Sequence, residues 1–432
     1  MNLVFRQHKF VNNIVYIELI TVALLVAAYV IFNSTLILAA FVFACALVFC
    51  SNDEDSVDYL AFFTSFSGIF VYRGRHMYFV MVALFMFRFL LRRKIYKSTF
   101  VYYMLIAIYS VAFCDLNAGI TFAKLIGLIL LFAIPVIATV APQINCRKFM
   151  QHYILGFALS TFIGYFAQKI PAMAMLWDYD LMWTKNYTEL TRFCGLAYDS
   201  NFYALTNYVI LAYLLFSFKK LNWLRASLIV FFILSGLQTV SKSYFLVLAV
   251  LLICYFIKSA PNASQFLLSL IAAIVCIAVF VYISNKLGYN VIELVTDRFD
   301  TGGSLSDNTT GRTGIWKSYL NMFNAAGPKA YMFGFGFNAL VTRAAHNTFV
   351  EFIYHYGLLG LAMWTAYLVH CSKLFSRASC LFKYKSRMPA LAFLIGIFFL
   401  SAYTYEAFWM GIVISFLTFG GAGKERNLII HV

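Results

Sequence analysis

Apolar stretches long enough to cross a bilayer recur along the whole chain, and they restrict its fold more than any other feature. Each covers roughly 16–22 residues, the length that crosses a hydrocarbon core as a helix. These segments must be helical because lipid offers no hydrogen-bond partner to an unpaired backbone group. Only 12% of the residues are charged and 63% are hydrophobic, whereas soluble domains have about 25% charged residues. The sequence therefore predicts an all-α polytopic membrane protein.

We expect about fourteen transmembrane helices. Their ranges are 14–32, 35–50, 57–72, 76–91, 99–115, 119–141, 150–168, 202–218, 224–240, 243–258, 264–284, 347–370, 388–403 and 405–420. They form three blocks, N-terminal (1–168), central (202–284) and C-terminal (347–432), which two long polar loops at 169–201 and 285–346 separate. An even number of spans places both termini on one side of the membrane.

The net charge of +16 indicates how these helices are oriented. Basic residues gather in short loops that the order of the spans places on one side, a pattern typical of cytoplasmic loops. They are Arg92, Arg93, Lys94, Lys97, Arg147, Lys148, Lys219, Lys220, Arg225, Lys258, Lys424, Arg426 and the basic residues of 373–387. One short outer loop, with Arg73 and Arg75, departs from the pattern. We therefore expect both termini in the cytoplasm, the two long loops outside, and no nucleic acid as a partner.

Three polar stretches allow local predictions. Residues 296–316 (TDRFDTGGSLSDNTTGRTGIW) are rich in Gly, Asp, Ser and Thr and are expected to form a loop. The spacing in KSYLNMFNAA predicts a short helix that ends near Gly327. The GFGFN sequence around Gly334 is expected to be a flexible turn, and the acidic run 52–58 a solvated inner loop.

Several cations come from distant parts of the chain to the outer side. Arg192 precedes a span, and Lys242 occupies a tight turn between two spans. Arg312 lies in the second long loop, and His346 stands at the entrance of the next span. Lys124 lies in an apolar run near the outer end of its span, where a charge is costly. Because basic residues usually favour the inner face, this convergence indicates an anionic ligand.

The chemistry of these side chains suits a lipid-linked diphosphate. A guanidinium group presents a planar fork of donors that matches phosphate oxygens, and it stays charged. A diphosphate leaving group gains charge as its bond to sugar breaks, so fixed cations could stabilise the transition state by on the order of several kcal/mol. No cluster of His, Cys, Asp and Glu has metal-ligand spacing, so we expect neither a metal nor a cofactor. The imidazole of His346 suits proton transfer near neutral pH.

Each of these residues also has an ordinary structural interpretation. Arg192 and Arg312 could pair with loop carboxylates, and the candidates are Asp199, Asp297 and Asp300. Lys242 could anchor its turn at the membrane interface. His346 and Asn347 could be a hydrogen-bonding pair at a helix start. The residues alone leave these alternatives open.

At these positions the chain resembles the O-antigen polymerase and ligase family. The resemblance runs in order over about residues 190–360. Its elements are Arg192 with Gly195 and Asp199-Ser200-Asn201; Ser241-Lys242-Ser243, where Arg is more usual than Lys; Gly311-Arg312 with Trp316; Gly334-Phe335-Gly336; and His346-Asn347, whose span continues to Gly357 and Gly360. The first half of the chain is similar to the family only in hydropathy.

The resemblance implies a metal-independent glycosyltransferase of the GT-C type at the periplasmic face of the bacterial inner membrane. Its donor and acceptor would be undecaprenyl-diphosphate-linked oligosaccharides, and its other partners membrane lipid and a chain-length regulator. Arg192 and Arg312 would bind diphosphate, Lys242 would assist, and His346 would position or deprotonate the acceptor hydroxyl. The remaining candidates for binding substrate are Ser241, Ser243, Asn201, Asn347, Gly311, Trp316 and Lys124.

Polymerase, ligase and transporter all remain possible functions. A polymerase transfers the growing chain onto a new lipid-linked repeat unit, and a ligase transfers the finished chain onto lipid A-core. The aromatic-rich composition, with 47 Phe and 29 Tyr, favours a polymerase. A transporter for the same lipid would place its charges near the middle of the bilayer and show internal repeats, whereas the notable charges here lie at one face.

Overall fold

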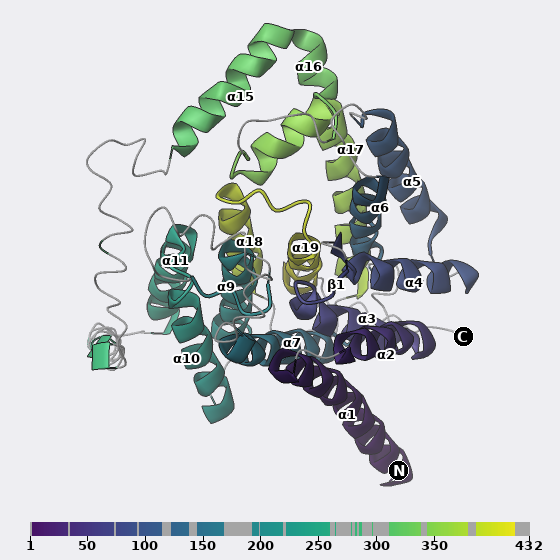
Figure 1. Ribbon diagram of the computed structural model, residues 1–432, viewed down its shortest axis with the longest axis vertical. Helices are drawn as coiled ribbons and strands as arrows, with labels where there is room; N and C mark the ends of the chain where they lie inside the picture. The colour runs from purple at the N-terminus through teal and green to yellow at the C-terminus, as the bar shows by residue number, and fades with distance from the viewer. Residues whose placement is uncertain are drawn as a thin grey trace.

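Helices build nearly all of the described structure, which is a computed structural model (Figure 1). It describes residues 2–32, 35–72, 75–92, 95–114, 122–137, 145–167, 192–197, 199–218, 222–259, 311–337, 344–378 and 386–419, with residues 264, 278, 281–282, 285–286 and 296. In these ranges the only strands are β1 (Val71–Tyr72) and β2 (Arg75–His76), which pair as an antiparallel hairpin. The predicted all-α class is confirmed.

Most helices of the first half begin and end close to the predicted spans. They are α1 (Asn2–Phe32), α2 (Leu36–Cys50), α3 (Asp53–Phe63), α4 (Tyr78–Leu91), α5 (Lys97–Ala112), α6 (Phe122–Leu131) and α7 (Cys146–Ala167). However, α1 begins well before the span predicted at 14–32 and α6 ends well before residue 141. The span predicted at 57–72 differs in structure as well. There α3 continues as a single 3-10 turn, Thr64–Phe66, and the chain then forms the hairpin.

Most helices of the second half also begin and end close to the predicted spans. They are α9 (Ser200–Phe216), α10 (Trp223–Leu237), α11 (Lys242–Ser259), α15 (Arg312–Ala326), α16 (Pro328–Phe333), α17 (Thr348–Ala378), α18 (Met388–Phe398) and α19 (Glu406–Phe419). The span predicted at 264–284 lies almost entirely outside the described residues. Of the two predicted outer loops, the first is described only from residue 192 and the second chiefly over 311–337.

Membrane spanning is supported by helix length and by the exposed surface. Among the described helices, Thr348–Phe375 of α17 is long and apolar enough to cross a membrane, as judged by length and composition, and shorter apolar helices accompany it. Large apolar side chains are exposed on many of these helices, among them Leu24, Leu38, Leu91, Ile108, Phe162 and Ile253. So much exposed apolar surface is unusual for a soluble monomer, and it is consistent with a polytopic membrane protein.

The central helix of the fold is α9. Every residue of α9 is buried except Asn201, near its N-terminal end. It packs against α10, α11, α18 and α19, which surround it in Figure 1. A helix that is apolar on all sides belongs inside a bundle. Asn201 is therefore the point at which this helix reaches the accessible surface.

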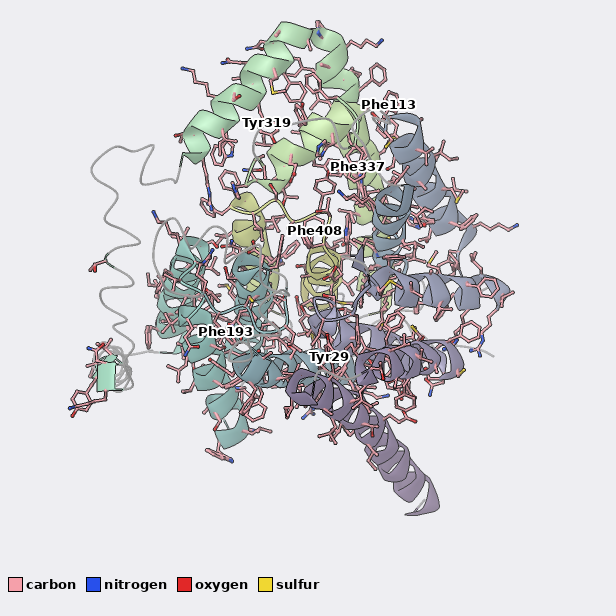
Figure 2. The ribbon with its side chains drawn as sticks, in the orientation of Figure 1. Tyr29, Phe113, Phe193, Tyr319, Phe337 and Phe408 are labelled. Atoms are coloured by element: carbon pink, nitrogen blue, oxygen red, sulfur yellow. The ribbon has the colours of Figure 1, made fainter. Side chains whose placement is uncertain are left out.

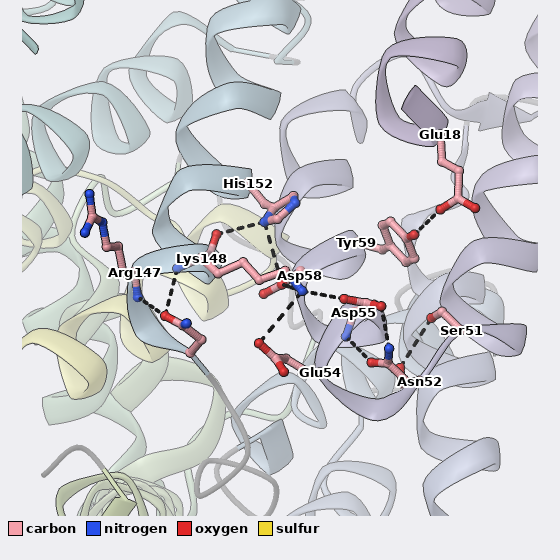
Figure 3. Close-up of polar contacts among 11 residues, drawn as sticks. Glu18, Ser51, Asn52, Glu54, Asp55, Asp58, Tyr59, Arg147, Lys148 and His152 are labelled. Atoms are coloured by element: carbon pink, nitrogen blue, oxygen red, sulfur yellow. Dashed lines mark hydrogen bonds and ion pairs between the residues drawn. The ribbon is translucent and has the colours of Figure 1, made fainter. Parts of the chain in front are cut away.

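The acidic run at 52–58 is the start of α3 and not the solvated loop that the sequence predicted (Figure 3). Asn52 caps the helix by accepting a hydrogen bond from the Asp55 backbone N–H. Asp53, Asp55 and Asp58 are all buried. Carboxylates are stabilised at a helix N-terminus by the exposed N–H groups and the helix dipole, but burial also requires cations nearby.

Those cations come from α4 and α7. Asp53 accepts from Arg88 at 3.1 Å and from Arg92 at 2.7 Å. Lys148 pairs with Asp55, Asp58 and Glu54, as Figure 3 shows. We call Asp53, Asp55, Asp58, Arg88, Arg92 and Lys148 the ionic network. It joins α3, α4 and α7, and no pattern in the sequence predicts that these helices pack together.

An arm made of α15 and α16 extends from the bundle and folds back onto α17 (Figure 1). The helix predicted at 317–326 is confirmed, but it begins at Arg312, so residues 312–316 are helical and not loop. Gly311 makes this start possible because it adopts a left-handed φ of 76°, which glycine tolerates. The helix ends before Gly327, as predicted.

The turn around Gly334 is held in place by backbone hydrogen bonds. Phe335 N–H donates to the Tyr354 carbonyl at 2.7 Å, and Phe337 N–H donates to the Phe113 carbonyl at 2.9 Å. Gly334 lies so close to Gly357 that a Cβ atom on it would fall 2.6 Å from the Gly357 nitrogen. The expectation of a flexible turn was wrong, because the turn anchors the arm to α5 and α17.

Candidate functional site

Arg192 is held beside the N-terminal end of α9 by neutral oxygen atoms. Its Nε donates to the Thr239 carbonyl at 2.9 Å, and its Nη2 donates to Oδ1 of Asn201 at 3.2 Å. The backbone next to it is fixed as well, since Phe193 N–H donates to the Gln238 carbonyl at 3.0 Å. These contacts fix the direction of the guanidinium and hold it between the end of α10 and the start of α9.

Close packing of Gly195 explains why the segment after Arg192 fits here. Gly195 has a left-handed φ of 59°, and a Cβ atom on it would lie 2.8 Å from the Tyr203 ring. A Cβ on Gly164 of α7 would in turn lie 2.5 Å from Gly195. The buried Phe193 ring stacks on Tyr165 (Figure 2). Glycine is therefore required for the segment to pass between α7 and α9.

The Ser241-Lys242-Ser243 turn meets Arg192 through Asn201. Ser241 Oγ donates to Asn201 Oδ1 at 3.0 Å and lies 2.9 Å from Ser243 Oγ. Lys242 is the first residue of α11 and is half-buried. A single amide oxygen thus accepts from both Arg192 and Ser241, as its two lone pairs allow.

Arg312 opens α15 and has an incompletely satisfied guanidinium. Its Cζ lies 5.9 Å from the centroid of the Phe399 ring, within the range of a cation–π contact. Its Nε is buried and has no hydrogen-bond partner among the described residues. Leaving a buried donor unsatisfied costs about 1–3 kcal/mol. A ligand with acceptor oxygens would remove that cost.

The positive charges of Arg192 and Arg312 act on each other. Burial lowers the pKa of the Arg312 guanidinium from its ordinary value, and the charge of Arg192 lowers it further. Arginine nonetheless remains protonated in proteins. We call Arg192, Asn201, Ser241, Ser243 and Arg312 the arginine site. Two like charges near each other are an arrangement that suits an anion with several oxygen atoms, such as a diphosphate.

One face of α15 runs across the start of α17 and the end of α18. Arg312, Trp316 and Tyr319 share this face because they follow the four- and three-residue spacing of a helix. The indole Nε1 of Trp316 donates to the Ala345 carbonyl at 2.8 Å, and the ring packs edge-on against Phe398. Figure 2 shows Tyr319 between α15 and α17. The arm therefore brings Arg312 over the helix ends of the bundle.

His346 and Asn347 form the start of α17. Oδ1 of Asn347 accepts from the backbone N–H groups of Phe349 at 2.9 Å and Val350 at 3.1 Å, which is an N-cap. The helix-start interpretation is therefore right for Asn347. His346 is half-buried and has a φ of 48°, a strained conformation for a residue other than glycine. Strain of this kind is often found at functional positions.

The structure brings most of the predicted site residues together. Hydrogen bonds join Arg192, Asn201, Ser241 and Ser243. Arg312 is close enough to Arg192 for the two positive charges to act on each other. Gly311, Trp316, His346 and Asn347 lie along the same arm and helix start. Lys124 is different. It is exposed on α6, a helix that packs against α4 and α5, and no described contact joins it to the arginine site.

The connection between α18 and α19 is part of this region, and the sequence analysis missed it. The Thr348 hydroxyl donates to the Leu400 carbonyl and accepts from the Ala402 N–H. Tyr403 hydrogen-bonds His355 of α17. The connection was hidden because its residues are mostly apolar and continue two predicted spans. Its only signal in the sequence is Ser401, Thr404 and two tyrosines in the hydrophobic run 399–405.

Residues 226–365 match a family model described as O-antigen ligase. We refer to these matched residues, about a third of the chain, as the O-antigen ligase domain. The resemblance predicted from the sequence is thereby confirmed. Proteins of this family are membrane-embedded enzymes of polysaccharide biosynthesis with lipid-linked polysaccharide substrates. Among curated proteins, none matches the chain.

The O-antigen ligase domain supplies only part of the arginine site. Ser241, Ser243 and Arg312 lie inside the matched residues, as does His346. Arg192 and Asn201 precede them, in the segment next to α9. The hydrogen bonds of Asn201 to both sides therefore connect the O-antigen ligase domain to the rest of the chain.

Proposed function

We propose that this protein is a polysaccharide polymerase. It transfers the growing glycan of an O-antigen or related surface polysaccharide from undecaprenyl diphosphate onto a lipid-linked repeat unit. The observation that carries the proposal is the half-buried pair of arginines, Arg192 and Arg312; the buried Nε of Arg312 has no hydrogen-bond partner among the described residues. Such a pair suits a diphosphate better than any neutral ligand.

The arginines would act on the leaving group. As the bond between the anomeric carbon and the diphosphate breaks, the diphosphate keeps the electron pair and its negative charge grows. Arg192 and Arg312 stabilise that charge from fixed positions, which reduces the reorganisation needed during the reaction. Lys242 adds a third positive charge at the start of α11. The proposal includes no metal and no cofactor.

Polar groups around Asn201 keep this arrangement rigid. The shared amide oxygen orients Arg192 and Ser241, and Ser243 adds a hydroxyl at the same place. His346, at the entrance of α17, positions or deprotonates the acceptor hydroxyl. Trp316 holds the backbone immediately before His346 through Ala345. Gly311 allows Arg312 to be the first residue of its helix.

We propose a GT-C-type arrangement of about fourteen membrane-spanning helices with both termini in the cytoplasm. The position of α7 supports it. Lys148 of the ionic network is near one end of this 22-residue helix, and Gly164 near the other end contacts the segment that follows Arg192. Sixteen residues of helix rise about 24 Å, close to the hydrocarbon thickness. The ionic network would then be cytoplasmic and the arginine site periplasmic in the bacterial inner membrane.

An O-antigen ligase is the second candidate, because the matching family model carries that description. A ligase would use the same diphosphate donor and transfer the finished chain to lipid A-core. We favour the polymerase because of the aromatic-rich composition, with 47 Phe and 29 Tyr. A chain-length regulator would be a partner of the polymerase only.

A transporter of lipid-linked oligosaccharide is the third candidate. Transporters commonly bind their substrate near the midplane of the bilayer. The charged residues of this region instead stand at helix starts, since Arg192 donates to Asn201 at the beginning of α9 and Lys242 opens α11. Arg312 likewise opens α15. This distribution favours an enzyme.

Deletion of the gene, followed by complementation, tests the proposal. Strains carry the wild type, Arg312→Ala, or the control Lys317→Ala, an exposed cation one turn further along α15. Surface polysaccharide is resolved on a gel. We expect Lys317→Ala to restore the ladder and Arg312→Ala to leave a single repeat on the core. Loss of every repeat from the core, with long chains still on undecaprenyl diphosphate, would assign a ligase. An unchanged ladder in the deletion strain would exclude both enzymes.

A further inference from the structure

Glu351 is a carboxyl group close to the arginine site that the proposed mechanism leaves without a role. It lies in the first turn of α17, where its N–H donates to the Asn347 carbonyl at 3.1 Å. The residue keeps part of its surface accessible. Within the described ranges it forms no ion pair with Lys, Arg or His. A carboxylate without a cation is unusual in an enclosed position and often has a function.

The surroundings of Glu351 show that it faces the arm from the first turn of α17. The Ser401 hydroxyl lies beside its carboxyl group. Burial raises the pKa of Tyr319 on α15, and the neighbouring charge of Glu351 raises it further. The side chain of Glu351 therefore extends from the first turn of α17 toward the α18–α19 connection and α15.

Arg312 belongs to α15 and contacts the end of α18, so it lies against the same two elements as the Glu351 side chain. Arg312 and Tyr319 are seven residues apart on one face of α15, which corresponds to about 10 Å along the axis. Phe399, which lies against the Arg312 guanidinium, is two residues before Ser401. Glu351 and Arg312 thus border the same surface, formed by α15 and the end of α18.

The other described carboxyl groups have different surroundings. Glu54, with the aspartates of the ionic network, lies at the start of α3, and Glu18 accepts from Tyr59. Asp199 caps α9. Glu406 accepts from Ser67 and lines a small cavity, about 20 Å³, between α7, α9 and α19. Among the described residues, Glu351 is therefore the carboxyl group that faces the arm.

We infer that Glu351 is the base that accepts the proton of the acceptor hydroxyl. In this step the acceptor oxygen forms a bond to the anomeric carbon of the donor sugar. The bond from that carbon to the diphosphate breaks, and the diphosphate leaves with the electron pair. The hydroxyl proton moves to the Glu351 carboxylate, and His346 orients the acceptor. This inference rests on the proposed glycosyl transfer.

The test uses the full-length protein in lipid nanodiscs and a synthetic undecaprenyl-diphosphate-linked repeat unit. Donor affinity and the single-turnover transfer rate are measured separately for the wild type, Glu351→Gln and Glu351→Asp. Glu406→Gln is the matched control, because Glu406 also lies in the first turn of a helix beside a serine. Loss of a general base typically costs about 10²–10⁴ in rate.

We expect Glu351→Gln to transfer about 10²-fold more slowly or worse with unchanged donor affinity. Glu351→Asp should keep part of the wild-type transfer rate. The control Glu406→Gln should keep most of it. A Glu351→Gln rate within about threefold of the wild type would overturn the inference. A loss of donor affinity that accompanies the loss of rate in both Glu351 variants would also overturn it, because Glu351 would then be structural. A wild-type protein that binds the donor but transfers nothing would reject the proposed function itself.

Discussion

The ionic network and the arginine site both contain arginine or lysine side chains that are at least partly buried, but the surroundings of those charges differ. In the ionic network, the cations meet carboxylates from α3, and every aspartate there is close to a cation. In the arginine site, Arg192 donates to neutral oxygens, and Arg312 stacks on a ring with its Nε unsatisfied within the described residues.

The pKa values of Lys148 and Arg312 shift in opposite directions. Although burial lowers the pKa of Lys148, the hydrogen bond to Asp55 and the neighbouring carboxylates raise it overall. The pKa of Arg312 is lowered, by burial and then by Arg192. The carboxylates of α3 thus stabilise the charge of Lys148, whereas the positive charge of Arg192 opposes that of Arg312. This contrast fits a structural role for the ionic network and supports our proposal that the arginine site binds an anionic ligand.

The largest expected effect concerns catalysis at the arginine site. Arg312→Ala should lower the transfer rate about 10²–10³-fold, the range found when a donor to a developing negative charge is removed. Thermal stability should change little, because the side chain makes no ion pair in the described part of the structure. The rate is measured with purified protein and the synthetic donor. A variant with wild-type transfer would show that the unsatisfied guanidinium has no part in the reaction.

The ionic network should respond in the opposite way. Arg88→Ala leaves Asp53 buried with half its cations, and breaking a buried pair costs about 3–5 kcal/mol. We expect a clear fall in the unfolding temperature with normal transfer per folded molecule. Arg92→Ala is the control, since its side chain is 47% exposed, and exposed pairs contribute about 1 kcal/mol or less. Equal destabilisation by the two variants would contradict our account of the network.

Asn201→Asp makes the arginine site resemble the ionic network. The new carboxylate would lie at the position from which Asn201 Oδ1 now accepts from Arg192, at 3.2 Å. It should neutralise Arg192 and weaken donor binding about tenfold, equivalent to about 1.4 kcal/mol. Stability should be kept or increased. Donor affinity is measured by titration in nanodiscs, and unweakened binding by this variant would contradict the proposed need for excess positive charge.

The smallest expected effect is at Trp316. Trp316→Phe keeps an aromatic ring against Phe398 but loses the hydrogen bond to the Ala345 carbonyl. One such bond contributes about 0.5–1.5 kcal/mol, so we expect the transfer rate to fall only a few-fold. The variant tests whether the arm positions His346. A loss as large as that of Arg312→Ala would indicate that Trp316 contacts substrate directly.

The helices were the most predictable part of the fold. Hydropathy fixes them because a bilayer sets the length of each apolar segment, and α2 and α4 begin and end within two residues of the predicted spans. Hydropathy, however, measures only the transfer of a segment out of water, and it does not identify the helices against which that segment packs. The acidic start of α3 was therefore misread, since its cations come from α4 and α7, far along the chain.

The candidate site was predictable where charge and family resemblance coincide. Arg192, Asn201, Ser241 and Arg312 were all expected, but the hydrogen bonds that join the first three depend on how α9, α10 and α11 pack. Glu351 was missed because a single acidic residue in an apolar run carries no pattern. Its proximity to Tyr319 arises only when α15 folds back onto α17.

The most direct test of the central claim is the affinity of the purified protein for undecaprenyl diphosphate in nanodiscs. The wild type, Arg312→Ala and Lys317→Ala are compared at the same salt concentration. We expect Lys317→Ala to bind like the wild type and Arg312→Ala to bind at least about tenfold more weakly, a difference of about 1.4 kcal/mol. Equal affinities for all three proteins would contradict the claim that the arginine site binds the diphosphate.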